Sequence, residues 1–169
     1  MVLLTGDGKG KTTSALGMAL RATGHDLSVC VIQFIKQSAD TGEARALRLL
    51  PNVEHHICGN GFVLPSDADT VREHHITAAK AGLQIAQKKL ADPNTDMVIL
   101  DEICGAIALG LLTEQAVLDI LHTADNKIII LTGRNATPAL IDLCDTVSNI
   151  HDSKHGFYVN LSSQPGVEF

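Results

Sequence analysis

The residues best suited to chemistry lie near the start of the chain, where residues 5–17 read TGDGKGKTTSALG. This stretch combines four glycines, two lysines and three consecutive hydroxyl residues, and it follows an apolar run typical of a short strand. Glycine-rich turns let backbone N–H groups surround phosphate oxygens, and the N-terminus of a following helix adds its dipole. In such a loop Lys11 would neutralise terminal phosphate oxygens and the Thr12 hydroxyl would bind Mg²⁺. The stretch therefore predicts a binding site for a polyphosphate compound.

The match to the phosphate-loop pattern G-x-x-x-x-G-K-S/T is close but incomplete. Residues 10–12 stand as the pattern requires, whereas Thr5 holds the first glycine position, and counting from Gly6 leaves the loop one residue short. The alternative is a glycine-rich turn between a strand and a helix with an incidental Lys-Thr pair. Lys9 adds a second positive charge to the loop, or is simply a solvated lysine.

A second chemical feature is the segment MVILDE, residues 97–102, in which four apolar residues precede Asp101 and Glu102. In a parallel sheet this pair would lie at the carboxyl end of a strand, which is where ligands bind. Either carboxylate could complete the coordination of Mg²⁺, directly or through water; a solvated acidic strand end is the alternative. Arg134, in LTGRNA, follows another apolar run and could bind a phosphate oxygen through two N–H groups, or it is a surface arginine in a turn.

The composition of the chain argues against nucleic-acid-binding and membrane proteins. The chain has 169 residues, enough for a substantial core, and 13 basic against 19 acidic side chains give a net charge of −6. This charge disfavours broad attraction to nucleic acid or to an anionic membrane. No run approaches the roughly 18–20 unbroken apolar residues of a membrane span, and the first residues do not form a signal peptide. We therefore expect a cytoplasmic protein with no nucleic-acid or membrane partner.

Cysteine and histidine give no sign of a metal centre. The four cysteines have no C-x-x-C spacing, so they predict neither a disulfide framework nor a zinc site. The eight histidines include two adjacent pairs, whose side chains point different ways, and metal ligation by histidine is not expected. The sequence also contains neither a G-x-S-x-G elbow nor a reactive-cysteine signature. It therefore indicates triphosphate binding without a protein nucleophile.

Apolar runs suited to buried strands alternate with helical patterns along the chain. Strand-like runs cover residues 2–4, 27–34, 53–57, 96–102 and 127–134. Helical patterns cover 11–24, 42–50, 69–92, 113–124 and a segment near 137–144. We expect Gly24 to end the first helix, and Asp67 or Asp69 to cap the third. Thr113 would cap the fourth. The alternation predicts an α/β fold, a mostly parallel sheet with helices on both faces, in one domain over residues 1–169.

Three functions are compatible with these features. The first is an ATPase or phosphoryl-transfer enzyme such as a nucleotide kinase, in which Glu102 orients water or an acceptor hydroxyl. The second is a nucleotide-binding module without chemistry. In the third, ATP is attacked away from phosphorus by a nucleophile that a second substrate brings.

A longer series of segments resembles one family. In order, they are TGDGKGKTTSALGMALRATGHDLSVCVIQFIK, GEARAL, GNGF, MVILDEI, ALGLL, LTGRNATPALIDLCDTVSNI and KHGFYVNLSSQPGVEF. Together they resemble the phosphate-loop ATP:corrinoid adenosyltransferases that act on cob(I)alamin or cob(I)yrinic acid a,c-diamide. The resemblance implies a RecA-like P-loop NTPase fold, usually a homodimer, and transfer of the 5′-deoxyadenosyl group from ATP to Co(I) with release of triphosphate. The reduced corrinoid would be the second substrate in adenosylcobalamin biosynthesis or salvage, and a flavoprotein or other reductase could supply its electron.

The resemblance also implies roles for particular residues. The loop would hold the ATP phosphates through Gly6, Asp7, Gly8, Lys9, Gly10, Lys11, Thr12 and Thr13. Lys11 would stabilise the departing triphosphate, and Arg134 would contact the nucleotide. Thr12 with Glu102 would hold Mg²⁺, and Asp101 is the neighbouring candidate ligand.

One departure from the family concerns the corrinoid site. Many members have a segment like G-x-G-F-T-W, whose aromatic side chains lie near the corrinoid and help remove the lower ligand of cobalt. This chain reads GNGFVLP and keeps Phe62, but Leu64 stands where tryptophan is common. We expect both side chains at the lower face of the corrinoid, and slower turnover from cob(II)alamin than from cob(I)alamin. Many members also carry a segment before the first strand that folds over the active site, so a more open corrinoid site is expected here.

Overall fold

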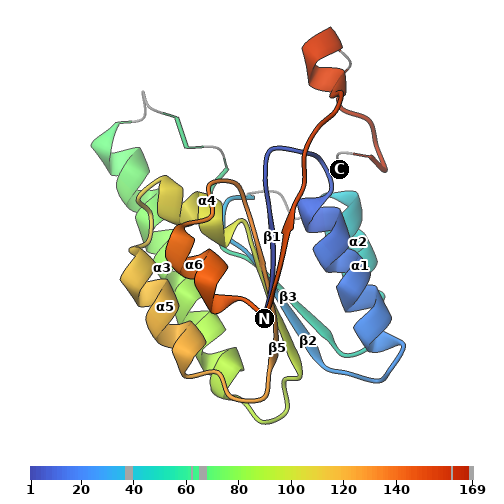
Figure 1. Cartoon of the computed structure of the whole chain (residues 1–169), viewed down its shortest axis with the longest axis vertical. Coiled ribbons are helices and arrows are strands. Elements are labelled where there is room, and N and C mark those ends of the chain that lie inside the picture. Colours follow the sequence, from blue (N-terminus) through green and yellow to red (C-terminus); the bar gives the residue numbers. More distant parts are fainter. Residues whose placement is uncertain (37–39, 62, 65–67, 161, 168–169) are drawn as a thin grey trace.

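One sheet organises the residues that the computed structural model describes, namely 1–36, 40–61, 63–64, 68–160 and 162–167. Its six strands lie in the order β3-β2-β4-β5-β1-β6, and every pairing between neighbours is parallel (Figure 1). The strands are β1 (Val2–Thr5), β2 (Val29–Gln33), β3 (Val53–Ile57), β4 (Met97–Asp101), β5 (Ile128–Thr132) and β6 (Thr146–Asn149). The predicted α/β fold with a parallel sheet is confirmed.

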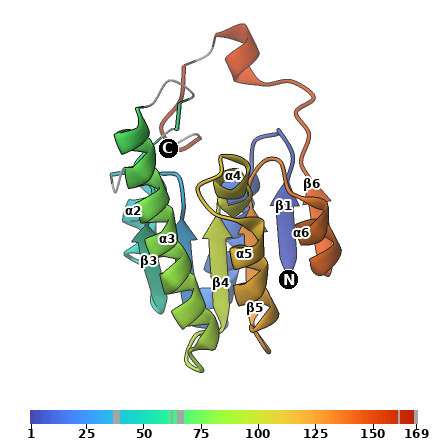
Figure 2. The ribbon, with the colours of Figure 1, turned by 90° about the vertical axis from the view of Figure 1, so that its left-hand side faces the viewer.

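Helices cover both faces of the sheet, as the alternation of patterns predicts. They are α1 (Lys11–Thr23), α2 (Gly42–Leu47), α3 (Asp69–Ala91), α4 (Ile103–Ala108), α5 (Glu114–His122) and α6 (Pro138–Leu143), with a short 3₁₀ helix η1 (Gly156–Val159). α1 and α2 lie on one face of the sheet, and α3 to α6 lie on the other (Figures 1 and 2). The segment with η1 extends beyond the carboxyl ends of the strands, on the side where the β1–α1 loop lies.

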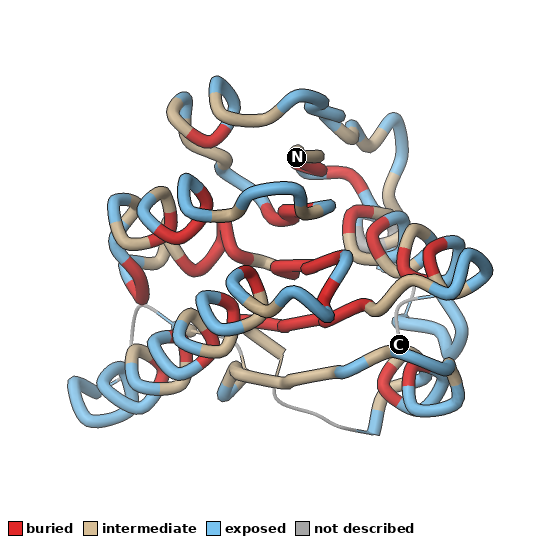
Figure 3. The backbone as a smooth tube through the Cα atoms, turned by 90° about the horizontal axis from the view of Figure 1, so that it is seen from below, coloured by how far each residue is buried: buried red, intermediate tan, exposed pale blue. Residues whose placement is uncertain are grey.

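The central strands are apolar at almost every residue because both of their faces are covered. In β4, Val98 and Leu100 belong to the core on the α3 face, whereas Met97 and Ile99 belong to the core on the α1 face. β2 and β4 are buried throughout, and Figure 3 shows buried strand segments between the helices. Strands covered on both faces are typical of parallel sheets. Asp101 ends β4 on the α1 face, which brings its carboxylate to the first turn of α1.

Local signals set the helix ends, and the sequence predicts most of them. Gly24 is the C-cap of α1, and the Thr113 side chain accepts a hydrogen bond from a backbone N–H in the first turn of α5. The predicted cap of α3 is wrong, because Ala68 occupies the N-cap position without a side-chain bond and Asp69 is the first helical residue. The other candidate cap, Asp67, lies outside the described residues.

The sequence patterns do not predict two of the elements, α4 and β6. α4 has the sequence ICGAIA and is largely buried, so it lacks the polar face and the amphipathic period of a surface helix. β6 has the sequence TVSN and is exposed at the edge of the sheet, so it contains no apolar run. None of the helices in the described ranges is long and apolar enough to cross a membrane.

Candidate functional site

The glycine loop between β1 and α1 is shaped by its glycines. Gly6 and Gly10 adopt positive φ angles of 95° and 121°, a conformation that residues with a side chain rarely adopt. Gly8 lies so close to the segment after β6 that an added Cβ would be 2.7 Å from the carbonyl carbon of His151. Its N–H donates to the Ile150 carbonyl at 2.8 Å. The loop is therefore fixed at Gly8 against the segment that follows β6.

Lys11 lies inside this loop. Its Nζ donates to the carbonyl oxygens of Gly6 at 2.7 Å and of Gly8 at 2.8 Å. The residue is only 7% exposed, and burial lowers the pKa of Lys11, while the nearby Glu102 carboxylate acts in the opposite direction. A partly desolvated ammonium group at the centre of a curved backbone is suited to an anion, because its interaction with phosphate is less screened than at the surface.

Asp101 joins the loop helix to the sheet. Its Oδ1 accepts hydrogen bonds from the Thr12 hydroxyl at 2.8 Å and from the Thr132 hydroxyl at 2.7 Å. Its Oδ2 accepts from Gln33 Nε2 at 2.9 Å. The carboxylate is 1% exposed, so these donors take the place of water around it. The side chain of Thr12 is thereby fixed relative to the ends of β2, β4 and β5.

Glu102 differs from its neighbour in backbone and in environment. It has a positive φ of 62° at the N-cap of α4, and its N–H donates to Thr132 Oγ1 at 2.8 Å. Burial, followed by the adjacent Asp101 carboxylate, raises the pKa of Glu102, and Lys11 opposes this shift. Glu102 lines the cavity at the loop, where its side chain comes so close to Gly105 that an added Cβ there would lie 2.9 Å from Oε2.

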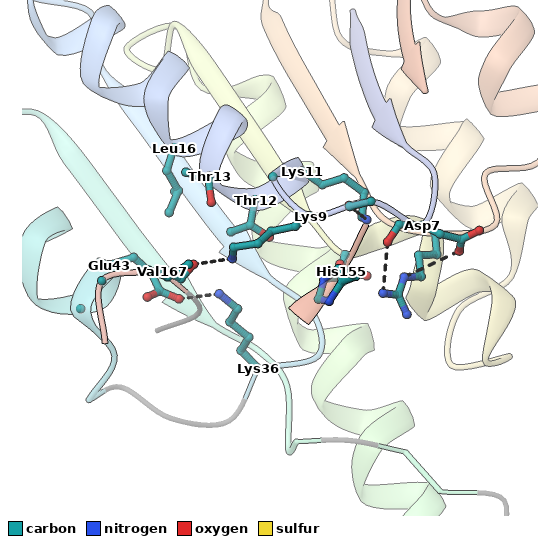
Figure 4. Close-up of a pocket in the computed structure, with 16 residues that line it drawn as sticks. Asp7, Lys9, Lys11, Thr12, Thr13, Leu16, Lys36, Glu43, His155 and Val167 are labelled. Carbon is teal, nitrogen blue, oxygen red and sulfur yellow. Dashed lines mark hydrogen bonds and ion pairs between the residues drawn. The ribbon is translucent and has the colours of Figure 1, made fainter. Parts of the chain in front are cut away.

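Two further cations border the loop. Arg134 Nη2 donates to the Asp7 carbonyl at 3.3 Å, and its Nε lies 3.9 Å from Asp7 Oδ1. Lys9 Nζ donates to the Val167 carbonyl, so the C-terminal segment crosses the mouth of the loop (Figure 4). Both cations are placed where they can reach an anion in the cavity, since both line it.

A cavity of about 500 Å³ brings the predicted phosphate residues together. Asp7 to Thr13, Glu102 and Arg134 line it, whereas the Asp101 carboxylate lies behind Thr12. Sequence reasoning assigned no role to the rest of its lining: Leu16, Lys36, Gly42, Glu43, His155, Gly166 and Val167 (Figure 4). Lys36 and Glu43 form an ion pair across the cavity from Lys11. The volume falls within the range of small-molecule sites.

Comparison with known proteins identifies the family. The family model described as ATP:corrinoid adenosyltransferase BtuR/CobO/CobP matches residues 1–169. The chain belongs to this ATP:corrinoid adenosyltransferase family. It is 39% identical to a corrinoid adenosyltransferase of Pseudomonas aeruginosa, over 100% of this chain and 83% of the relative. The corresponding enzymes of Salmonella typhimurium and Escherichia coli are 37% and 36% identical, each over 100% of this chain and 85% of the relative.

Of the two residues predicted for the corrinoid of this adenosyltransferase, the structure describes only Leu64. Phe62 lies outside the described residues. Leu64 is 54% exposed and is not among the residues that line the cavity. A corrinoid site at these positions stays a prediction.

The donor atoms around Thr12 suit magnesium in this adenosyltransferase. The Thr12 hydroxyl and the Glu102 carboxylate line the cavity and offer hard oxygen ligands of the kind that Mg²⁺ prefers, whereas the Asp101 carboxylate lies behind Thr12 and holds its hydroxyl. Elsewhere in the described ranges, Cys30, Glu54 and His56 bring their ligand atoms within 4.8 Å of one another. There, however, Lys89 pairs with Glu54, and burial raises the pKa of the Cys30 thiol to about 12. That group is therefore better described as an ion pair beside a protonated thiol.

The sequence signals for the missed residues of this adenosyltransferase site were weak. Lys36 and Glu43 lie within family segments, QFIK and GEARAL, that carry no recognised chemical spacing. Gln33 and Thr132 are polar residues at the ends of apolar strands, and this position at the ligand-binding edge is the one signal that could have indicated them.

Proposed function

We propose that this chain, acting as one domain, transfers the 5′-deoxyadenosyl group of ATP to the Co(I) of a corrinoid, cobalamin or cob(I)yrinic acid a,c-diamide, and releases triphosphate. One observation carries the proposal: Lys11, Thr12 and Glu102 line a single cavity in a chain that matches the adenosyltransferase family over its whole length. The reaction would serve adenosylcobalamin biosynthesis or salvage.

The loop would hold the triphosphate of ATP. Backbone N–H groups of the loop from Gly6 to Thr13, other than that of Gly8, which donates to Ile150, would surround phosphate oxygens. The N-terminus of α1 would add its dipole. Lys11 would exchange its two carbonyl partners for phosphate oxygens when ATP binds, and it would then stabilise the charge that develops on the leaving group. Arg134 lines the same cavity beside Asp7 and would contact the nucleotide there. Preorganised cations stabilise such charge without reorganising at the moment of reaction.

Thr12 and Glu102 would hold Mg²⁺, with Asp101 behind Thr12. Bound there, the cation would neutralise phosphate oxygens and help the triphosphate to depart. Thr12 can present its oxygen lone pairs to the cavity because its proton is directed to Asp101. The raised pKa of Glu102 is consistent with a carboxylate that gains from a bound cation, because burial and Asp101 both oppose its charge.

The bond changes balance without a protein nucleophile. The Co(I) electron pair forms the bond to the 5′ carbon of ATP, the bond between that carbon and its phosphate oxygen breaks, and triphosphate departs with the electron pair. Among the residues that the structure describes, the lining of the cavity contains no cysteine or serine. In the proposed reaction the substrate brings the nucleophile. Phe62 and Leu64 remain our candidates for the corrinoid. As in the family, we infer a homodimer and a reductase, such as a flavoprotein, that prepares the cobalt.

Product analysis tests the proposal. The protein is incubated without oxygen with ATP, Mg²⁺ and chemically reduced cob(I)alamin, while the corrinoid spectrum and the phosphate products are followed. Formation of adenosylcobalamin with triphosphate is expected. ADP or orthophosphate without a change in the corrinoid would instead indicate an ordinary P-loop ATPase or a nucleotide kinase and would overturn the proposal.

A further inference from the structure

A row of polar side chains crosses the sheet on the α1 face, where its neighbours are apolar. The row consists of His55 in β3, Gln33 in β2, Asp101 in β4 and Thr132 in β5. Side chains two positions apart in a strand point to the same face of the sheet. Two positions before each member of the row is a residue of the core on the α1 face: Val53, Val31, Ile99 and Ile130, respectively. Gln33 and Asp101 are partners in neighbouring strands, and each is 1% exposed. A buried amide beside a buried carboxylate needs a specific reason, because burial of polar groups is costly without partners.

Hydrogen bonds connect the row in one direction. His55 Nε2 lies 2.8 Å from Gln33 Oε1, and Gln33 Nε2 donates to Asp101 Oδ2 at 2.9 Å. Because a carboxylate only accepts hydrogen bonds, Gln33 must turn its NH₂ group toward Asp101. Its Oε1 then faces His55, which must donate through Nε2–H. The carboxylate thus sets the orientation of the amide, and the amide sets the proton position on the imidazole.

We propose that Gln33 and His55 are positioning residues for the magnesium side of the nucleotide site. They hold Oδ2 of Asp101, which keeps Oδ1 directed at the Thr12 hydroxyl and leaves the lone pairs of that hydroxyl facing the cavity. This inference rests on the proposed function, because it assigns Thr12 to Mg²⁺ in the ATP site. It extends the site from the loop across the sheet to the edge strand β3.

The chain of bonds matters because a hydroxyl can bind a cation well only when its proton points elsewhere. Without Gln33, Oδ2 of a buried carboxylate would lose its donor, and the carboxylate could turn away from Thr12. Groups behind metal ligands typically change metal affinity by about 10- to 100-fold when they are removed. Burial lowers the pKa of His55, reinforced by the adjacent His56, and this favours the neutral imidazole, which has one N–H.

The test compares ATP affinity with and without the metal. Calorimetry gives the Kd of ATP in Mg²⁺ and in EDTA, and their ratio measures how much the metal contributes. Gln33→Met keeps the side-chain length but removes the amide, and His55→Phe keeps a ring but removes the donor. His55→Gln restores an N–H near the position of Nε2. His56→Phe is the matched control, because His56 bonds to Glu54 and not to the row.

The expected results differ between variants. Gln33→Met should reduce the Mg²⁺-dependent gain in ATP affinity by about tenfold, and His55→Phe by about fivefold, while the Kd in EDTA changes less than about twofold. His55→Gln should recover most of the loss, and His56→Phe should match the wild type. Equal losses in Mg²⁺ and EDTA, an unchanged ratio in His55→Phe, or a wild type whose affinity ignores Mg²⁺ would overturn the inference.

This binding measurement does not depend on adenosyl transfer. A wild type that binds ATP with the expected metal dependence but forms no carbon–cobalt bond would overturn the proposed function and leave the positioning role intact. Should Gln33→Met fail to fold, which its circular dichroism would show, the comparison of His55→Phe with His55→Gln decides the question alone, because His55 is only half-buried.

Discussion

Lys11 Nζ donates a hydrogen bond to the Gly8 carbonyl at 2.8 Å, so the backbone of the glycine loop holds the ammonium group of Lys11 in place. A second bond, to the Gly6 carbonyl, fixes the ammonium group at the centre of the curve. The ammonium group therefore keeps its place, and under the proposed function an incoming phosphate would replace these carbonyl oxygens. Preorganisation of this kind is worth most in a site where burial reduces screening.

Lys11→Met should lower the rate of adenosyl transfer by about 100- to 1000-fold, because one fixed donor to developing charge contributes on that order. The rate is measured from the corrinoid spectrum at saturating ATP. Lys80→Met, on the exposed face of α3, is the matched control and should leave the rate unchanged. A Lys11→Met rate within tenfold of the wild type would contradict the role assigned to Lys11.

Two glycines near the loop should respond in opposite directions to substitution by alanine. Gly8→Ala would put a Cβ 2.7 Å from the backbone of His151, and we expect it to lower the free energy of unfolding by about 1–3 kcal/mol. Gly17→Ala lies within α1, where no atom of the described residues is within 4 Å of the added Cβ, and it should raise the free energy of unfolding by about 0.5–1 kcal/mol. Thermal unfolding would report shifts of about 2–4 °C per kcal/mol. Equal shifts in both variants would show that close approach does not shape the loop.

Leu64→Trp should accelerate adenosylation that starts from cob(II)alamin and a reductant, while the rate from cob(I)alamin changes little. Tryptophan would fill an apolar site against the lower face of the corrinoid more rigidly than leucine and help to displace the lower cobalt ligand. Leu49→Trp is the control, because Leu49 is 84% exposed after α2. No gain with cob(II)alamin, or an equal gain in the control, would remove Leu64 from the corrinoid site.

The ion pair between Glu54 of β3 and Lys89 of α3 should make stability depend on pH. The hydrogen bond from Lys89 lowers the pKa of Glu54, so the contribution is present above the ordinary value of 4.5 and is lost as the pH falls through the lowered pKa. Because the pair is partly exposed, Glu54→Gln should cost less than about 1 kcal/mol at pH 7. Urea titrations from pH 7 to acid should show the difference from the wild type shrinking below pH 4.5. The assigned ion pair would be contradicted if the loss of unfolding free energy in Glu54→Gln stayed constant with pH. It would also be contradicted if the variant of an exposed glutamate, Glu73→Gln, showed the same dependence on pH.

The sequence predicts those parts of the site that depend on local spacing. Two parts of the site are contiguous in sequence and directly follow a recognisable strand: the loop from Gly6 to Thr13 and the pair Asp101-Glu102. In a parallel sheet, the carboxyl ends of the strands lie on the same side, so both parts are expected there. Gln33 and Thr132 could not be predicted in the same way. Their contact with Asp101 depends on which strands are neighbours and which face each residue occupies, and neither is set by spacing along the chain.

The C-terminal segment illustrates the same limit. His155 and Val167 come from a part of the chain without a hydrophobic period. Only the tertiary structure brings both of them to the cavity and Val167 beside Lys9. α4 was missed for a different reason, because its small buried residues have no polar face to mark a helix. Strong periodicity and contiguous motifs are thus predictable here, whereas contacts between distant segments are not.

The fate of the 5′ carbon of ATP tests the central claim most directly. ATP labelled with ¹³C at this carbon is incubated without oxygen with the protein, Mg²⁺ and cob(I)alamin, and the products are followed by NMR. We predict that the labelled carbon becomes bound to cobalt and that one triphosphate is formed for each carbon–cobalt bond. Label that stays attached to oxygen, in ATP, ADP or AMP, would contradict the account.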